Sequence, residues 1–293
     1  MRTLDLAWIL VVMIVWGFNF VVAKWGLAEL PPIFLMALRF GMVAALLLPF
    51  VRMPRKNLGA ILALSATLGC LHFSLMFTGL AGVDASVASI AIQLQVPFAA
   101  ILAAIVFKDR LGWRRLAGMG LAFAGIVVMA GEPRVASAPL PLALVLAASL
   151  LWAIANIQMK QLAAIDGFAL NAYMSLFAAP QLIAVSAVLE TGQIEALRNA
   201  SLWGYASLAY MAVMVTILSY AIWYRLLRRY SVNQTMPFTL LVPIFGVLSG
   251  VLVLDEPLTW RVLVGGIATI AGVGIIVLRR PRTADPEAVA KTL

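Results

Sequence analysis

The sequence predicts an all-α integral membrane protein whose ten transmembrane helices form two inverted five-helix repeats. Three observations lead to this prediction: an apolar composition, ten apolar windows of membrane-spanning length, and a set of residues that recurs half a chain later. Hydrophobic residues make up 64% and charged residues 11% of the 293 residues, against about 45–50% and about 25% in soluble domains. A water-soluble chain of this length has too much surface to hide so many apolar side chains.

The ten windows follow one another along the chain. A hydrocarbon layer about 30 Å thick requires about 20 apolar residues in a helix. Such windows lie at residues 6–24, 33–51, 58–80, 85–107, 114–131, 140–159, 168–189, 202–224, 233–254 and 261–278. They are apolar at both odd and even positions, unlike the alternating strands of a transmembrane barrel. The first window lacks a signal-peptide cleavage site, so we expect it to be retained.

Turn residues separate the windows. Pro31-Pro32 follows the first window and Asp166-Gly167 the sixth, and such pairs mark turns. Sixteen of the 21 basic residues lie at the termini and in the turns after even-numbered windows, while four lie at the opposite ends. Because cytoplasmic loops carry the excess of Lys and Arg, this bias predicts that both termini are cytoplasmic. It also accounts for the net charge of +9 without a nucleic-acid partner.

Several residues of the first half recur in the second. The matched pairs are Trp16 with Trp152, Lys24 with Lys160, Pro97 with Pro243, Asp109 with Asp255, Gly118 with Gly265 and Gly125 with Gly272. They divide the chain into a first five-helix repeat (1–131), a linker (132–139), a second five-helix repeat (140–280) and a polar cytoplasmic tail (281–293). Because five is odd, the second repeat must insert upside down, as in many transporters.

Three stretches resemble those of a known family. They are VVMIVWGFNFVVAKWGL at 11–27, LPPIFLMALRF at 30–40 and RRYSVNQTMPFTLLVPIFGVLSGVLVLDEPLT at 228–259. The chain resembles the EamA branch of the drug/metabolite transporter superfamily, and these stretches are similar to those of bacterial exporters of aromatic amino acids and of O-acetylserine and cysteine. One departure is KDRLGW at 108–113, where family members commonly carry a Glu-Arg pair. Asp109 can still cap or pair there.

The resemblance implies an exporter of amino acids, aromatic or small and neutral, and of related metabolites. It implies a multi-pass protein of the cell inner membrane with a central cavity between its halves, which works by alternating access. The partners it implies are the amino acid substrate and the lipid bilayer. Alternatives are a transporter of another small metabolite or drug, such as a nucleotide sugar or sugar conjugate, a channel or lipid translocator, and a polytopic membrane enzyme.

Polar and aromatic side chains inside the windows are the candidate substrate-binding residues. An amide in hydrocarbon has to pair with another helix or face an aqueous cavity. Trp16 and Asn19 share one helix face in the first window, and Trp152 and Asn156 share one in the sixth. We expect all four to line a central site, where the rings would take an ammonium group or stack on a substrate. The alternative is that the amides join helices and the Trp rings pack or anchor.

His72, Gln93 and Tyr220 extend this candidate set. His72, the single histidine, lies mid-way along the third window and would line the cavity, relay a proton, or simply pair with a neighbouring helix. Gln93 lies before Pro97, and Gln95 is two residues further, about 200° around an α-helix. We therefore expect Gln93 to face the cavity and Gln95 to join helices. Tyr220, in the eighth window, is a similar candidate.

Arg39 is the one charged residue well inside a window. A buried cation in a membrane is costly unless it reaches the headgroups or pairs. Arg39 would attract a substrate carboxylate, extend outward to headgroups, or hold Asp84.

Proline and glycine suggest where helices bend and touch. Pro97 and Pro243 lie at matching positions, and each removes an intrahelical hydrogen bond, so we expect them to act as hinges. The alternative is a static kink. Glycines recur at seven-residue spacing, at Gly118, Gly125, Gly265 and Gly272. We expect them to pack helices within each half, and a homodimer face is the alternative, so monomer and homodimer both remain open.

The sequence predicts no catalytic residue, metal site or cofactor. It contains one His and one Cys, and no glycine cluster follows a strand as a nucleotide site requires. No Asp or Glu falls mid-window, where a proton-coupled pump places its carboxylate relay. Gradient-driven, facilitated efflux is therefore the simplest mechanism.

Overall fold

The computed structural model describes residues 2–106, 112–162, 164–230 and 232–278. Within these ranges, ten helical segments are long and apolar enough to cross a membrane. In order, these first to tenth spans are Thr3–Leu27, Pro32–Phe50, Leu58–Gly82, Ala85–Val106, Trp113–Ala130, Pro139–Gln161, Gly167–Leu189, Leu202–Leu226, Met236–Leu254 and Trp260–Val277. The prediction of an all-α protein with ten spans is confirmed. Asp109 and the tail at 281–293 lie outside the described residues.

Six spans consist of one long helix. They are α1 (Thr3–Leu27), α2 (Pro32–Leu47, extended by a 3-10 turn at Leu48–Phe50), α7 (Trp113–Ala130), α9 (Pro139–Gln161), α10 (Gly167–Leu189) and α16 (Trp260–Val277). Short helices α8 (Pro133–Ala136) and α11 (Gln193–Asn199) and a 3-10 turn at Arg55–Asn57 connect spans.

The other four spans are interrupted. The third is α3 (Leu58–Leu64), a π-helical segment (Ser65–His72) and α4 (Phe73–Gly82); the eighth is α12 (Leu202–Ala209), a π-helical segment (Tyr210–Leu218) and α13 (Ser219–Arg229). The fourth is α5 (Ala85–Ala91), a 3-10 turn (Ile92–Leu94) and α6 (Gln95–Val106); the ninth has a 3-10 turn (Met236–Leu240) between α14 (Val232–Thr235) and α15 (Leu241–Leu254). The interruptions therefore match between the predicted halves.

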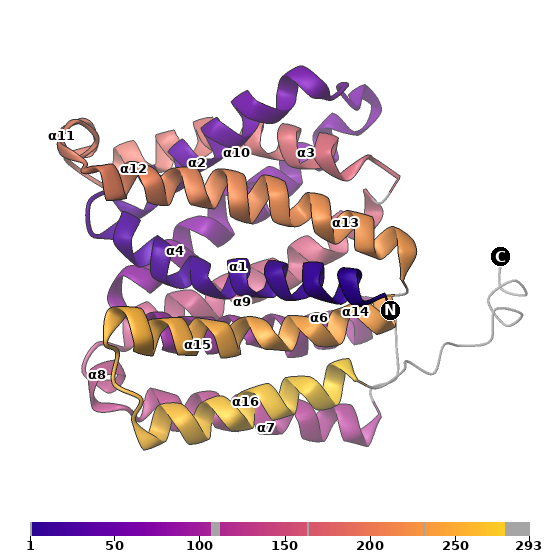
Figure 1. Cartoon of the computed structure of the whole chain (residues 1–293), viewed down its shortest axis with the longest axis vertical. Helices are drawn as coiled ribbons and strands as arrows, with labels where there is room; N and C mark the ends of the chain where they lie inside the picture. The colour runs from indigo at the N-terminus through magenta and orange to yellow at the C-terminus, as the bar shows by residue number, and fades with distance from the viewer. Residues whose placement is uncertain (1, 107–111, 163, 231, 279–293) are drawn as a thin grey trace, which may run out of the picture.

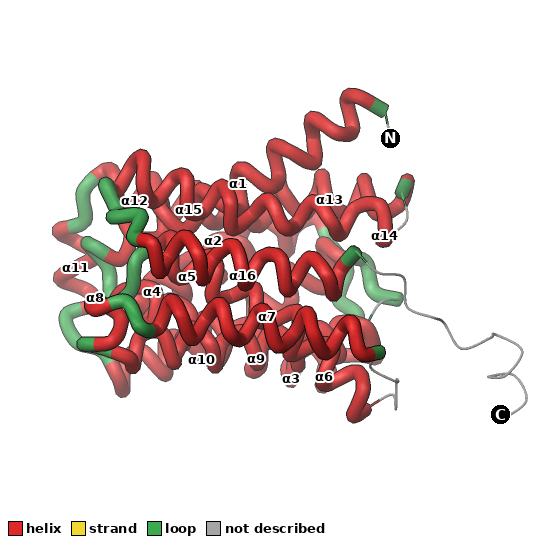
Figure 2. The backbone as a smooth tube through the Cα atoms, turned by 90° about the horizontal axis from the view of Figure 1, so that it is seen from below, coloured by secondary structure: helices red, strands yellow, loops and turns green. Residues whose placement is uncertain are grey.

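The helices lie side by side, and their connections gather at two ends of the bundle (Figures 1 and 2). One end carries α8 and α11, and we call it the α8 end. At the other, the terminal end, α1 begins and α16 finishes, at the right of Figure 1.

Spans of one predicted half pack against spans of the other. The fifth span packs against the tenth, the second against the seventh, and the fourth against the ninth. The first span packs against the eighth and ninth, and the sixth against the third and fourth. Exchanging the two halves leaves this set of pairs unchanged, because first-with-ninth becomes sixth-with-fourth and first-with-eighth becomes sixth-with-third.

Each predicted hinge proline is the third residue of the helix that follows a 3-10 turn. Pro97 and Pro243 lack the N–H that would bond the carbonyls of Gln93 and Thr239, four residues earlier, and both of those residues belong to the 3-10 turns. Bending at these points remains a prediction. The π-helical segments were not predicted. Such segments are rare and frequent at functional sites.

Glycines form the contact between α7 and α16. A Cβ at Gly118 would lie 2.8 Å from the carbonyl oxygen of Gly272, and one at Gly265 would lie 2.5 Å from that of Gly125. The expectation that these glycines pack helices within each half is therefore wrong. Two glycine-rich faces allow the closest backbone approach when they meet each other, and these two belong to different halves.

Burial falls from the α8 end to the terminal end. Every residue of α5 is buried, whereas Pro97 is the one buried residue of α6. On α9, one helix face carries Val145, Ser149, Trp152 and Asn156, and these are in turn fully buried, fully buried, partly buried and exposed. Along these two spans, the fourth and the sixth, residues are thus more buried towards the α8 end than towards the terminal end.

Candidate functional site

Arg39 lies buried in α2, with 4% of its surface exposed. Its Nη2 donates to Thr216 Oγ1 of the eighth span at 2.9 Å, and its Nη1 lies 4.0 Å from the Met36 sulfur. Its Nε is buried without a hydrogen-bond partner. Within the described part of the chain, no carboxylate pairs with Arg39. Two of the three roles predicted for Arg39, holding Asp84 and extending to the headgroups, are therefore wrong.

Aromatic rings of the third and sixth spans lie on one side of Arg39. The guanidinium carbon is 5.2 Å from the Phe73 ring centre. Phe73 contacts His72 at 4.8 Å between ring centres, and His72 contacts Trp152 at 5.0 Å. His72 Nδ1 lies 2.8 Å from the Ala148 carbonyl oxygen; because a carbonyl can only accept, this nitrogen carries the proton. The His72 N–H is thus bonded to the backbone of α9, and the His72 ring lies between those of Phe73 and Trp152.

Rings of the first and eighth spans form a second set of contacts. Tyr220 follows Thr216 by four residues, which places it on the same helix face. Its ring centre is 5.8 Å from that of Trp16, and Trp16 also contacts Trp223 at 5.5 Å. The Trp16 indole N–H donates to the Val215 carbonyl at 3.4 Å. The structure thus brings together Trp16 and Tyr220, which lie in different halves.

These side chains form one group, which we call the Arg39 cluster. It consists of Trp16, Arg39, His72, Phe73, Trp152, Thr216 and Tyr220. Neither Phe73 nor Thr216 was among the candidate residues predicted from the sequence. Both lie in or next to the π-helical segments, for which the sequence carried no recognised signal.

The predicted amides are placed differently from one another. Asn19 is partly buried, and its Oδ1 is buried without a partner. Asn156 is exposed, on the helix face of Trp152. Gln95 donates from Nε2 to Gln93 Oε1 at 3.4 Å, although an α-helix would point them apart. The 3-10 turn at Ile92–Leu94 has three residues per turn, which reduces their angular separation from about 160° to about 120°.

Four glutamates at the α8 end join the two halves, and we call them the glutamate caps. They are Glu29, Glu132, Glu190 and Glu256. Glu190 follows α10 and accepts from the backbone N–H groups of Ile33 and Phe34, at the start of α2, at 2.7 and 2.9 Å. The first N–H groups of a helix have no intrahelical partner, and a carboxylate there is favoured by the helix dipole.

Glu256 caps α5 in the same way, accepting from the N–H groups of Ala85 and Ser86 at 2.5 and 2.9 Å. Asp84 holds the N-cap position of α5 but makes no side-chain cap there. Burial, followed by the proximity of Glu256, raises the pKa of Asp84 above its ordinary value, and Lys24 acts in the opposite direction.

Glu29 of the first half and Glu132 of the linker both bind residues of the second half. Glu29 accepts from the N–H and hydroxyl of Ser201, before α12, at 2.5 and 2.6 Å, and these bonds lower the pKa of Glu29. Glu132 accepts from the Thr259 hydroxyl at 2.6 Å, and Thr259 in turn accepts from the Val262 N–H of α16 at 3.3 Å. The sequence indicated no bonding role for either glutamate.

Neutralising Asp84 is expected to leave thermal stability unchanged or to raise it, whereas Glu256→Gln lowers it. The fold raises the pKa of Asp84, so its ionised form costs stability at pH values above that pKa, and the cost disappears as the pH falls below the ordinary value. The difference between Asp84→Asn and wild type should therefore shrink on acidification. Thermal unfolding in detergent at pH 7 and pH 5 measures both variants. A lower melting temperature for Asp84→Asn at pH 7 would contradict this account.

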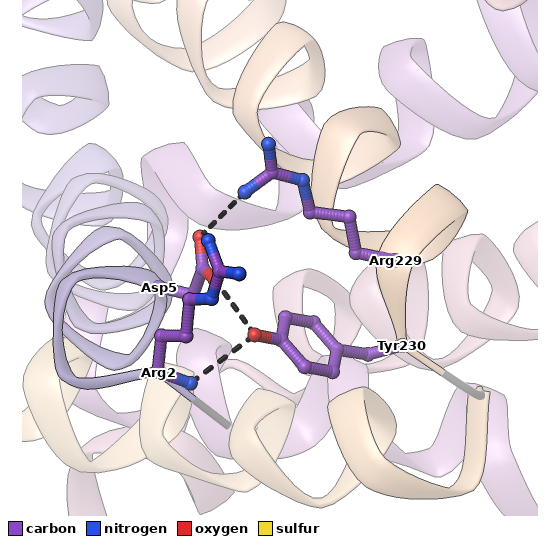
Figure 3. Close-up of polar contacts among 4 residues, drawn as sticks. All are labelled: Arg2, Asp5, Arg229 and Tyr230. Carbon is purple, nitrogen blue, oxygen red and sulfur yellow. Dashed lines mark hydrogen bonds and ion pairs between the residues drawn. The ribbon is translucent and has the colours of Figure 1, made fainter.

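A polar pocket of about 360 Å³ lies at the terminal end, lined by Arg2, Asp5, Arg229 and Tyr230 (Figure 3). The Tyr230 hydroxyl donates to Asp5 at 2.7 Å and accepts from the Arg2 N–H at 3.2 Å, and Arg229 lies 3.5 Å from the Asp5 carboxylate. This network joins the first and eighth spans near the bundle surface. It is distinct from the mid-membrane hollow that the sequence predicted.

No group of three His, Cys, Asp or Glu side chains in the described ranges is placed to hold a metal ion.

Comparison with known proteins identifies the family. The model of the EamA-like transporter family matches residues 4–131 and 140–278. A probable amino-acid metabolite efflux pump of Escherichia coli K12 is 35% identical over 277 residues, 91% of this chain and 92% of the relative. A pump described in the same words from Salmonella typhimurium LT2 is 36% identical over 278 residues, with coverage of 91% and 92%.

A solved crystal structure has the same fold. It superposes with a TM-score of 0.60 at 14% sequence identity and covers 94% of this chain and 96% of its own. The resemblance seen in the sequence is confirmed: the chain belongs to the EamA-like transporter family.

Proposed function

We propose that this protein exports amino acids and related metabolites across the cell inner membrane by alternating access between two inverted halves. The relatives named as probable amino-acid metabolite efflux pumps support the substrate class, since they match over nine-tenths of the chain. The observation that carries the proposal is the Arg39 cluster. It is polar and aromatic, and it is built from spans of both predicted halves.

The packing of the spans supports the inverted arrangement. Each predicted half contributes spans to a set of pairs that is unchanged when the halves are exchanged. The π-helical segments of the third and eighth spans and the 3-10 turns of the fourth and ninth also correspond. Two similar units related by an axis in the membrane plane would produce both patterns.

The charge distribution supports an orientation for this state. Arg2, Arg52, Arg225 and Arg229 lie at the terminal end or in its connections, which favours a cytoplasmic location for that end. The structure would then correspond to an inward-facing state, with the glutamate caps at its outer end.

The buried carboxylates support gradient-driven efflux. Asp5, Glu132 and Glu256 are the buried acidic residues in the described ranges, and all lie at span ends. A proton relay through the membrane centre would place an acid beside the Arg39 cluster. Export would then follow the substrate's own concentration difference.

Counterflow in proteoliposomes tests the proposal. Vesicles preloaded with unlabelled L-phenylalanine, L-serine or L-cysteine should accumulate the labelled amino acid, saturably and faster than protein-free vesicles. Collapsing a pH gradient should leave the rate unchanged. Absence of saturable counterflow for every amino acid tested, together with counterflow of a nucleotide sugar, would overturn the proposal. A strict requirement for a pH gradient would overturn the uncoupled mechanism alone.

A further inference from the structure

We propose that Arg39 is the binding site for the substrate's carboxylate, so that the transported class is the free α-amino acid and not its carboxyl-blocked derivatives. This inference rests on the proposed function and deepens it, because the relatives' names give no group on the substrate that is recognised.

The charge of Arg39 has no counter-ion in the structure. Arginine stays protonated in proteins, and a buried cation without an anion is strongly unfavourable. Arg39 is 4% exposed, and its partners are a hydroxyl, a thioether and two rings, from Thr216, Met36, Phe40 and Phe73. None of these neutralises it. An anion that binds beside Arg39 would therefore neutralise a charge that the protein itself leaves unpaired.

The geometry of the guanidinium suits a carboxylate. A guanidinium carries five N–H donors in a planar fork that binds a carboxylate through two parallel hydrogen bonds. Thr216 Oγ1 accepts one strong bond from Nη2, and the buried Nε has no partner. The rings of Phe40 and Phe73 lie 5.8 and 5.2 Å from the guanidinium carbon. The faces of these two rings attract the guanidinium cation through the π electrons of the rings. They supply no acceptor for the remaining N–H groups of the guanidinium.

The surroundings suit the other two groups of an amino acid. Asn19 Oδ1 is a buried acceptor without a partner, three residues from Trp16 on the same helix face. Trp16 contacts Tyr220, and Tyr220 lies one turn from Thr216, the partner of Arg39. An ammonium group would satisfy the amide oxygen. The rings of Trp16, Tyr220 and Trp152 would contact an apolar or aromatic side chain.

The same features disfavour other substrate classes. Arg39 is the one buried cation among the described residues. A nucleotide sugar carries two phosphate charges and would need further cations. A cationic drug would be repelled by Arg39 in a site of low dielectric constant. A single carboxylate matches a single guanidinium.

Carboxamide analogues test the proposal on the wild-type protein. L-Phenylalanine and L-phenylalaninamide differ at the carboxyl group, as do L-serine and L-serinamide. The free acids should raise the melting temperature in detergent and compete in counterflow about 10- to 100-fold better than the amides, because a hydrogen bond between charged groups is lost. Equal competition by acid and amide in the wild type overturns the proposal, whatever any variant does.

Arg39 variants then locate the effect. In Arg39→Gln the acid should lose its advantage over the amide, and Arg39→Lys should retain part of it, since the charge stays and the fork is lost. Arg198→Gln, at an exposed arginine of α11, is the matched control and should behave as wild type. A folded, monodisperse Arg39→Gln that still prefers the acid as wild type does would show that Arg39 is structural. If wild type transports no amino acid at all, it is the proposed function that fails.

Discussion

A leucine at position 125 is expected to prevent the protein from accumulating in a folded, monodisperse form. Gly125 on α7 faces the backbone of α16, where an added Cβ would meet the Gly265 carbonyl and the Thr269 N–H, the latter at 2.7 Å. Backbone atoms cannot move aside as side-chain ends do. Overpacking of a close contact costs about 1–3 kcal/mol or more, out of a total stability of about 5–15 kcal/mol.

Gly120→Leu is the matched control, since Gly120 lies on the same helix with no atom within 4 Å of an added Cβ. Size-exclusion chromatography and thermal unfolding in detergent measure both variants. Gly125→Leu should elute as aggregate or give little protein, and Gly120→Leu should resemble wild type. If Gly125→Leu stays folded and only changes the oligomeric state, the glycines form a homodimer face and the α7–α16 contact is not what holds the halves together.

Removing two glutamate caps is expected to open the outer end of the protein and to close the inner one. Glu190→Gln combined with Glu256→Gln weakens four hydrogen bonds to the starts of α2 and α5. Loss of a helix cap costs about 1 kcal/mol, so losing two shifts the equilibrium between states by about tenfold or more. In the proposed inward-facing state the α8 end, which would be the outer one, loses this energy, and an outward-open state that lacks these contacts would not.

Two cysteine reporters measure the shift in a Cys70→Ala background, which removes the single native cysteine. Ser89 is fully buried in α5, and Asn156 is exposed near the end of α9. With the caps removed, an impermeant thiol reagent should label Ser89→Cys faster from outside, and Asn156→Cys more slowly from inside. Glu195→Gln, at an exposed position of α11, should change neither rate. Faster labelling at both reporters would indicate general loosening and would rule out a gate.

The spans were predictable because the membrane makes them a local property of the sequence. Backbone groups in hydrocarbon must be satisfied within each helix, so a long apolar run such as residues 6–24 is sufficient evidence for a span. Which spans contact one another, by contrast, depends on residues far apart in the sequence. The partner of Gly118 and Gly125 was assigned to the wrong half because their spacing shows that a close contact exists without showing with which helix.

The candidate site was predictable only in part, for the same reason. Trp16, Tyr220, His72 and Trp152 were recognisable as unusual side chains in apolar runs. The structure joins Trp16 with Tyr220, and His72 with Trp152, through ring contacts. The role of Phe73 depends on Arg39, which comes from another span. Glu190 and Glu256 accept from backbone N–H groups, which every residue except proline has, so no residue type indicated these partners in the sequence.

The glutamate caps also bear on how the chain is made. Ile33 is separated from Glu190 by 157 residues, and Ala85 from Glu256 by 171. At about 5–20 residues per second, a ribosome takes about 10–30 s to extend the chain from the start of α2 or α5 to the glutamate that caps it. During this time, the first N–H groups of α2 and α5 lack their carboxylate partners. The cap that Glu256 makes on α5 can form only near the end of synthesis.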